Sequence, residues 1–193
     1  MIRKINGLIT NHKTGTTSCD NIYIVDYKNI NGGEVELFCE EPLERSVFLD
    51  NQQPIEIFYD LFLDNALVIA PGNHSKQCEC ILFPTSLNEE DWILFIETKY
   101  ANDIQAAFNK EADYPNCMIE QIICCVNFFR DKDIIPKAKK VHAILSFPTL
   151  IQDFSESFLL RCELTPEEIL ENHNIIIRPS NKIQVKSNKR LKI

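Results

Sequence analysis

The sequence lacks the long apolar segments of membrane and exported proteins. No apolar run approaches the roughly 18 residues of a membrane span, so no membrane partner is expected. Residues 1–15 are basic but lack the apolar core of a secretory signal peptide, which favours a cytoplasmic location. Internal repeats, low-complexity segments and clear linkers are also missing. The length suits a single domain over residues 1–193.

Metal-ligand spacing is absent from the eight cysteines. Cys78 and Cys80 form a CxC pair rather than CxxC, and no second pair has zinc-ligand spacing. A disulfide scaffold is disfavoured, because a chain of this size can hold its core without crosslinks and shows no export signal. Cys117, Cys124 and Cys125 fall in a helix-like segment, where cysteine acts as a small apolar residue. We therefore expect mostly buried, reduced thiols, with a structural metal and disulfides as the alternatives.

A Walker-type phosphate-binding loop is missing as well. In residues 12–18, HKTGTTS, the lysine precedes the glycine, whereas the Walker motif places its lysine after the last glycine. We expect a β-turn there. The four histidines show no ligand spacing to one another, and His142, in an apolar run, is expected to be a hydrogen-bonded core residue.

Positive charge is scarce in most of the chain. The net charge of −8 argues against a strong non-specific nucleic-acid binder, and the acidic first two thirds suit a basic protein partner. Residues 137–193 have the opposite balance, with 10 Lys and Arg against 6 Asp and Glu. The tail from residue 178 to 193 holds six basic residues and no acid. This tail is either a solvated end or an arm that contacts phosphates.

Apolar periodicity predicts an α+β or mixed α/β fold with a central mixed sheet and a β-rich N-terminal part, residues 1–59. Within that part, 21–27 and 34–40 are strand-like and are joined through the turn residues Gly32 and Gly33. The segment 55–63 can be strand or helix, because its periodicity does not decide between them.

The remaining chain divides into a core, residues 60–148, and a C-terminal part, residues 149–193. In the core we expect a hairpin, two helices and a strand, at 80–83 with 92–96, 101–112, 116–130 and 139–147. Asn116 is the expected N-cap of the second helix. In the C-terminal part we expect a helix that begins with a Thr165–Glu168 capping box, and then a terminal hairpin.

The predicted hairpin carries an acid at the outer end of each strand. If its two runs pair antiparallel about Asn88, Ile81 faces Phe95 and Glu79 falls opposite Glu97. Lys99 follows two residues later and therefore shares the same face. Two carboxylates held this close repel each other unless a cation lies between them, and a divalent metal is the simplest such cation.

Two alternatives stay open at this point. A register slip of one residue sends the two acids to opposite faces and removes the metal site. Glu97 and Lys99 can also be a surface ion pair at a solvated strand end, which contributes little to stability.

This arrangement resembles the PD-(D/E)xK nuclease superfamily, which has a restriction-endonuclease-like core. Its pattern is an acid on one strand, a hairpin to a second strand ending in (D/E)xK, then a helix and a further strand. CECILFP, WILFIETKY, MIEQIICCVNFF and KKVHAILSF are similar to these four segments, and the resemblance covers roughly residues 60 to 148. It implies a Mg²⁺- or Mn²⁺-dependent nuclease, acting on DNA in preference to RNA, or a member that has lost activity.

By this resemblance Glu79, Glu97 and the carbonyl of Thr98 would bind the metal. Lys99 would orient the attacking water and stabilise charge on the phosphate, and Gln121 would match the glutamine that several branches carry on the helix. The chain departs from the pattern at its first acid, which is Glu after Cys rather than Asp after Pro.

The superfamily often adds one more acid from an upstream element. Three carboxylates compete for that role, Glu56, Asp60 and Asp64. The alternative to a nuclease is a non-catalytic protein-interaction module on the same fold.

Overall fold

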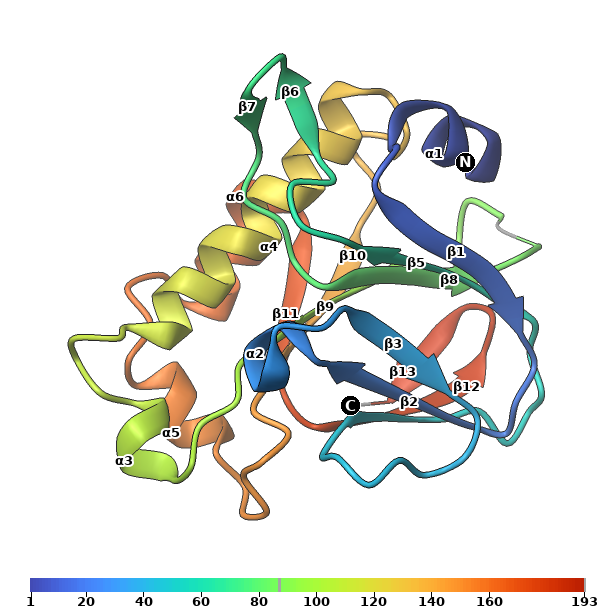
Figure 1. Ribbon diagram of the computed structural model, residues 1–193. Helices are drawn as coiled ribbons and strands as arrows, with labels where there is room; N and C mark the ends of the chain where they lie inside the picture. Colours follow the sequence, from blue (N-terminus) through green and yellow to red (C-terminus); the bar gives the residue numbers. More distant parts are fainter. Residues whose placement is uncertain (87, 193) are drawn as a thin grey trace.

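The computed structural model describes residues 1–86 and 88–192 and shows an α+β fold with two packed sheets (Figure 1). The larger sheet has the order β1-β5-β8-β9-β10-β11. Its strands are β1 (His12–Thr17), β5 (Ile57–Phe62), β8 (Cys80–Pro84), β9 (Leu94–Thr98), β10 (Val141–Ser146) and β11 (Ile175–Pro179). The strands from β1 to β9 pair antiparallel, whereas β9, β10 and β11 run parallel.

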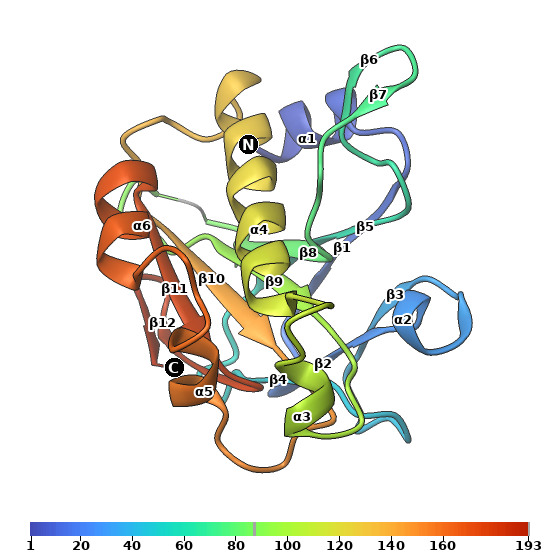
Figure 2. The same ribbon diagram turned by 90° about the vertical axis from the view of Figure 1, so that its left-hand side faces the viewer.

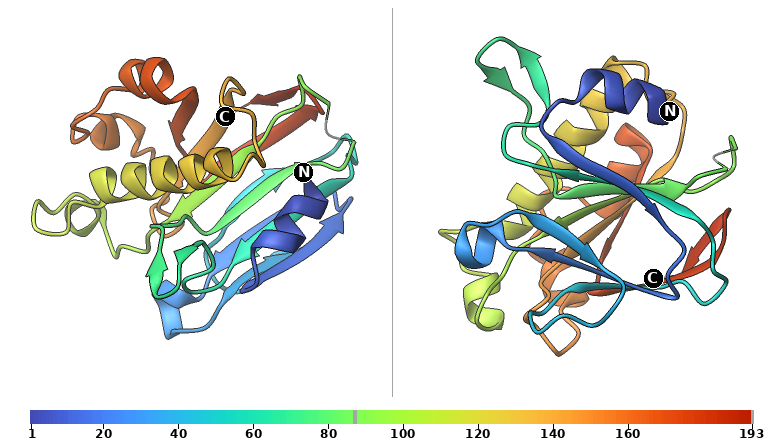
Figure 3. Two further views of the ribbon diagram at one scale, coloured as in Figure 1. Left: turned by 90° about the horizontal axis from the view of Figure 1, so that it is seen from above. Right: turned by 45° about the vertical axis from the view of Figure 1, so that its right-hand side comes forward.

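The second sheet has five strands in the order β13-β12-β4-β2-β3. Its strands are β2 (Asn21–Asp26), β3 (Val35–Phe38), β4 (Val47–Asp50), β12 (Lys182–Ser187) and β13 (Arg190–Lys192). A small hairpin of β6 (Val68–Ala70) and β7 (Asn73–His74) projects away from both sheets (Figure 3). The predicted N-terminal part therefore contributes strands to both sheets, and the segment left open at 55–63 forms strand β5.

The described residues also form six helices. They are α1 (Ile2–Leu8), α2 (Lys28–Asn31), α3 (Ile104–Ala107), α4 (Tyr114–Asp131), α5 (Ser155–Leu159) and α6 (Pro166–His173). The long helix α4 lies against one face of the larger sheet, in contact with β9 and β10 (Figure 2). Within the described residues, no helix has the length and apolar character needed to cross a membrane.

The central strands β8 and β9 of the larger sheet are buried on both faces, which explains their continuous apolar runs. Successive side chains of β9 alternate between two cores. Phe95 packs on the helix side, where its ring centroid lies 5.7 Å from that of Phe129 on α4. Leu94 and Ile96 point to the other side and join the core between the two sheets.

Helix α4 forms where the sequence places apolar residues at helical spacing. Met118, Ile122, Val126 and Phe129 are all fully buried. The predicted cap was wrong, because the helix begins at Tyr114 and Asp113 occupies the N-cap position. The side-chain amide of Asn116 donates to Asp113 Oδ1 at 2.8 Å from inside the first turn.

Four other local predictions can be compared with the structure. The helix expected at 101–112 is only the single turn α3, capped by Asp103. The turn expected at 12–18 is strand β1. The capping box of α6 is confirmed in both directions. The predicted terminal hairpin is wrong, because β11 and β12 do not pair with each other. Strand β11 pairs with β10 in one sheet, and β12 pairs with β4 and β13 in the other.

The cysteines are only partly as expected. Cys78, Cys80 and Cys125 are buried and free. Cys19 and Cys39, however, form a disulfide beside the β2–β3 pair, so the expectation of reduced thiols is wrong for these two. The two residues are 20 positions apart, and their proximity arises from the antiparallel pairing of β2 with β3.

Candidate functional site

The two acids of the hairpin lie at the same end of β8 and β9. The ladder pairs Cys80 with Ile96, Ile81 with Phe95 and Leu82 with Leu94, which is the register expected from the sequence. Just before β8, the Glu79 N–H donates to the Ile96 carbonyl at 2.9 Å. The predicted register thus holds over Cys80–Leu82, whereas the bond from Glu79 to Ile96 departs from it by one residue. The two carboxylates come from adjacent strands, but Glu79 and Glu97 are not a directly opposed pair of the ladder.

Each of these carboxylates is buried and faces a lysine. Glu79 is 4% exposed and its Oε2 lies 2.6 Å from Lys28 Nζ. Glu97 is fully buried and its Oε1 lies 2.5 Å from Lys99 Nζ. Glu97 is therefore not part of a surface ion pair, because its carboxylate is buried. Burial gives both pairs a desolvation cost that a solvated pair does not have.

Glu79, Glu97, Lys28 and Lys99 form one group of charges, and each charge shifts the pKa of its neighbours. Burial raises the pKa of Glu97 well above its usual value, and the nearby negative charge of Glu79 raises it further. Burial also raises the pKa of Glu79, against the opposing effect of Lys28. Burial lowers the pKa of Lys28 and Lys99, but their carboxylate partners raise it by more. The pKa of both ammonium groups is therefore above its usual value.

A third buried acid, Asp26, joins the group from the second sheet and was missed by the sequence reasoning. It is fully buried at the end of β2, and its negative charge contributes to the raised pKa of Glu79 and Glu97. Its Oδ2 accepts a hydrogen bond from Thr98 Oγ1 at 3.2 Å. The available signal was an acid that ends an apolar strand, which is the same pattern that singled out Glu79.

The three upstream acids considered from sequence have different positions. Glu56 accepts a hydrogen bond from Thr85 Oγ1 at 2.6 Å, after the far end of β8. Asp60 is fully buried and lies 2.8 Å from His12 Nδ1 on β1. Only Asp64 approaches the group, with its Oδ1 4.0 Å from Lys28 Nζ.

A cavity of about 580 Å³ opens beside Glu79. Lys28, Asp64 and Gln121 contribute to its wall together with Glu79. Gln121 projects from α4 and donates from Nε2 to the Gln77 carbonyl at 2.8 Å. The structure thus brings Gln121 and Glu79 to one cavity, whereas the other predicted site residues, Glu97, Thr98 and Lys99, do not line it.

The donor atoms of this site suit a hard divalent cation. Mg²⁺ is usually held by one or two carboxylates, with waters and substrate phosphates completing its shell. Glu79 and Glu97 supply such a pair, and Glu97 Oε2 is buried without a hydrogen-bond partner. Within residues 1–86 and 88–192, no three His, Cys, Asp or Glu side chains converge as a complete metal cage. The residues therefore fit a cation shared with solvent or substrate, not a closed structural site.

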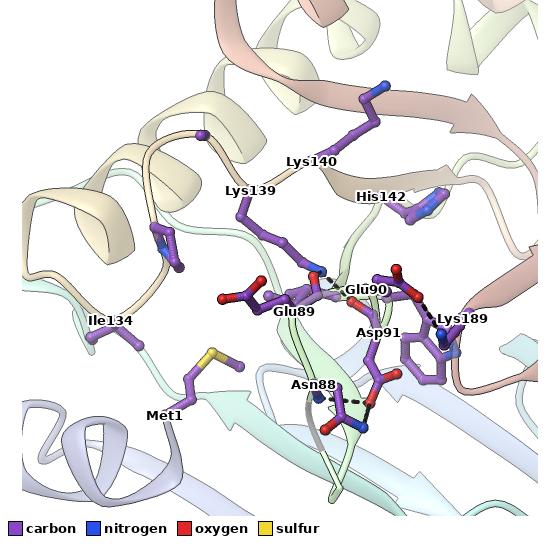
Figure 4. Close-up of a pocket in the computed structure, with 14 residues that line it drawn as sticks. Met1, Asn88, Glu89, Glu90, Asp91, Ile134, Lys139, Lys140, His142 and Lys189 are labelled. Atoms are coloured by element: carbon purple, nitrogen blue, oxygen red, sulfur yellow. Dashed lines mark hydrogen bonds and ion pairs between the residues drawn. The ribbon is translucent and has the colours of Figure 1, made fainter.

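A second cavity, of about 720 Å³, lies at the opposite end of β9 (Figure 4). Several of its charged groups have partners. Lys139 Nζ donates to the Asp91 carbonyl at 2.5 Å and also to the Glu89 carbonyl, and Lys189 pairs with Glu90. His142 lines this cavity, and its Nδ1 is buried without a hydrogen-bond partner, contrary to the expected core hydrogen bond.

The C-terminal tail is anchored beside this second cavity. Trp92 Nε1 donates to the Ser187 carbonyl at 2.9 Å, and the Trp92 N–H donates to the Asn188 carbonyl at 3.0 Å. The basic segment therefore forms the strands β12 and β13 as far as Lys192, while its basic side chains are exposed to solvent as in the first alternative.

No protein-family model, curated protein or solved structure matches the chain.

Proposed function

We propose that the chain is a metal-dependent nuclease-like protein that hydrolyses phosphodiester bonds, with DNA as the first substrate to test. The observation that carries this proposal is the pair of buried acids, Glu79 and Glu97, with Lys99 beside them. Burial of two neighbouring acids lowers the free energy of unfolding. Buried acids with raised pKa values are typical of functional sites.

The order of elements around the site supports the proposal. Strands β5, β8 and β9 form an antiparallel meander, α4 follows, and β10 returns parallel to β9. This is the order implied by the resemblance to the PD-(D/E)xK superfamily. A restriction-endonuclease-like core over residues 60–148 remains part of the proposal.

In this proposal Glu79, Glu97 and the Thr98 carbonyl hold Mg²⁺ or Mn²⁺. When bound, the metal polarises a phosphodiester and lowers the pKa of coordinated water. The Lys99 ammonium, kept charged by Glu97, stabilises negative charge that develops on the phosphate. Gln121 presents its amide on the cavity wall next to Glu79 and helps to position the substrate.

The test is Mg²⁺- or Mn²⁺-dependent cleavage of plasmid DNA and of RNA by the wild type, Glu97→Gln and Lys99→Met. Lys13→Met is the matched control, because Lys13 is an exposed lysine that pairs with Glu34 away from the cavity. We expect cleavage by the wild type and the control, with a loss of about 100-fold or more in the two site variants. Cleavage that survives both site substitutions contradicts the proposal.

One observation favours a second candidate, a non-catalytic protein-interaction module. The two acids already have lysine partners, so the four side chains neutralise one another and link the two sheets. The partner in this case would be a basic protein that binds the acidic surface. A folded wild type that neither cleaves nucleic acid nor binds Mn²⁺ is the expected result for this candidate.

A further inference from the structure

Lys28 reaches the site from the other sheet and is held there by its own backbone. It opens the single-turn helix α2 directly after β2. Asp26 Oδ1 accepts the Lys28 N–H at 3.0 Å, and the Tyr27 carbonyl accepts the N–H of Asn31 at 2.9 Å. Gly32 ends the turn with φ of 73°, a left-handed conformation that suits glycine. The start of the Lys28 side chain is therefore fixed.

The end of that side chain lies among oxygen atoms. Its Nζ is 2.6 Å from Glu79 Oε2, 3.4 Å from the Phe62 carbonyl and 4.0 Å from Asp64 Oδ1. Two carboxylates and a carbonyl are also the donor types that a hard divalent cation uses. Lys28 thus holds a position whose chemistry is that of a cation site.

The two lysines of the site differ in what surrounds them. Lys99 directly follows β9 and pairs with Glu97, two residues before it, and the Lys99 N–H donates to the Ser146 carbonyl at 2.9 Å. Lys28 comes from the second sheet and lines the cavity together with Glu79. A ligand that enters the cavity therefore contacts Lys28, and a flexible four-carbon stem lets the ammonium move without unfolding α2.

We propose that Lys28 is a resident cation, which in the free protein pairs with Glu79, the carboxylate that the proposed metal shares with Glu97 and the Thr98 carbonyl. Lys28 transfers to a substrate phosphate oxygen when metal and nucleic acid bind at the cavity. This inference rests on the proposed function. Two cations beside Glu79 repel each other, so metal binding is weak while Lys28 stays there. A phosphate removes that competition, and metal and phosphate consequently strengthen each other's binding by the same factor.

The experiment is calorimetric titration with Mn²⁺ of the wild type and Lys28→Met, each with and without a phosphorothioate oligonucleotide. In the absence of oligonucleotide, Lys28→Met should bind Mn²⁺ about tenfold more tightly than the wild type. The oligonucleotide should tighten Mn²⁺ binding by the wild type about tenfold and by the variant much less. Lys28→Arg, which keeps a cation, should behave as the wild type does, and so should the control Lys13→Met.

The outcomes separate this inference from the function on which it rests. If the wild type binds Mn²⁺ and Lys28→Met binds it no more tightly, the resident-cation role is wrong while the metal site stands. If no variant binds Mn²⁺, both are wrong. Circular dichroism establishes that each variant is folded, since removal of Lys28 leaves Glu79 buried without its partner.

A measurement on the unchanged protein covers the case in which Lys28→Met does not fold. The Nζ resonance of Lys28 in the wild type is followed by NMR as Mg²⁺ and oligonucleotide are added, with Lys13 as the internal reference. We expect the Lys28 signal to shift and the Lys13 signal to stay. An unchanged Lys28 signal at saturating ligand overturns the inference.

Discussion

The carboxylates of Glu79 and Glu97 lie at adjoining ends of neighbouring strands, and the negative charge of Glu79 helps to raise the pKa of Glu97. Both groups are at least 96% buried, since their exposed fractions are 4% and 0%. The protein compensates this repulsion with two ammonium groups, Lys28 and Lys99. The site is therefore a four-charge network between two sheets, and its energetics can be tested one pair at a time.

Glu97→Ala should lower the free energy of unfolding by about 3–5 kcal/mol, because it leaves the Lys99 ammonium in a largely buried position without its partner. Glu97→Gln combined with Lys99→Met removes both charges and should cost less than Glu97→Ala alone. Urea denaturation measures both values. A double variant that is less stable than the single one would show that the ion pair itself stabilises the fold.

The disulfide between Cys19 and Cys39 should contribute about 3 kcal/mol to stability, as expected for a closed loop of its length. Substitution of both residues by serine should therefore lower the urea midpoint. Mass spectrometry under non-reducing conditions reports whether the bond is present. If dithiothreitol leaves the wild-type midpoint unchanged and mass spectrometry shows two free thiols, the disulfide is absent in solution.

Folding stability should depend on the protonation of Asp60. Burial raises the pKa of Asp60 from 3.8 to about 8, so between these values the folded protein retains a proton that the unfolded chain has released. The contribution of this group is full below pH 3.8 and is lost as the pH rises to about 8. The slope is at most about 1.4 kcal/mol per pH unit for one proton.

Asp60→Asn isolates this effect, because His12, whose pKa is lowered by burial, is present in both proteins. Denaturation at the two ends of the pH range should show the wild type losing stability relative to the variant as the pH rises. A difference between the two proteins that is independent of pH would mean that Asp60 is ionised in the folded state.

The capping box of α6 offers a local test outside the site. Thr165 Oγ1 accepts the Glu168 N–H at 3.2 Å, and Glu168 Oε2 accepts the Thr165 N–H at 2.8 Å. Thr165→Ala removes one of these bonds and should cost about 1 kcal/mol in thermal or urea denaturation. A cost below about 0.3 kcal/mol would mean that water replaces the cap.

The central hairpin could be predicted from sequence because its information is local. Two apolar runs around a polar loop permit few registers, and in a hairpin the loop length selects among them. The observed pairing of Ile81 with Phe95 is the predicted one. The α+β class and the capped helix α6 also depend on nearby residues alone.

The rest of the site could not be predicted because it depends on contacts between distant segments. Asp26 and Lys28 lie more than fifty residues before Glu79 in the chain, and only the packing of β2 against the larger sheet brings them near. Strand β1 was missed for a related reason. Its residues include few apolar side chains, and it becomes a strand through pairing with β5.

Mn²⁺ binding to the proposed metal site can be measured by electron paramagnetic resonance, with the wild type compared to Glu79→Gln and Glu97→Gln. Both substitutions keep the side-chain shape but remove a negatively charged oxygen donor. We expect the oligonucleotide-bound wild type to hold one Mn²⁺ and each variant to bind it at least about tenfold more weakly. Equal Mn²⁺ binding by all three proteins, or none by the wild type, contradicts the proposed metal site.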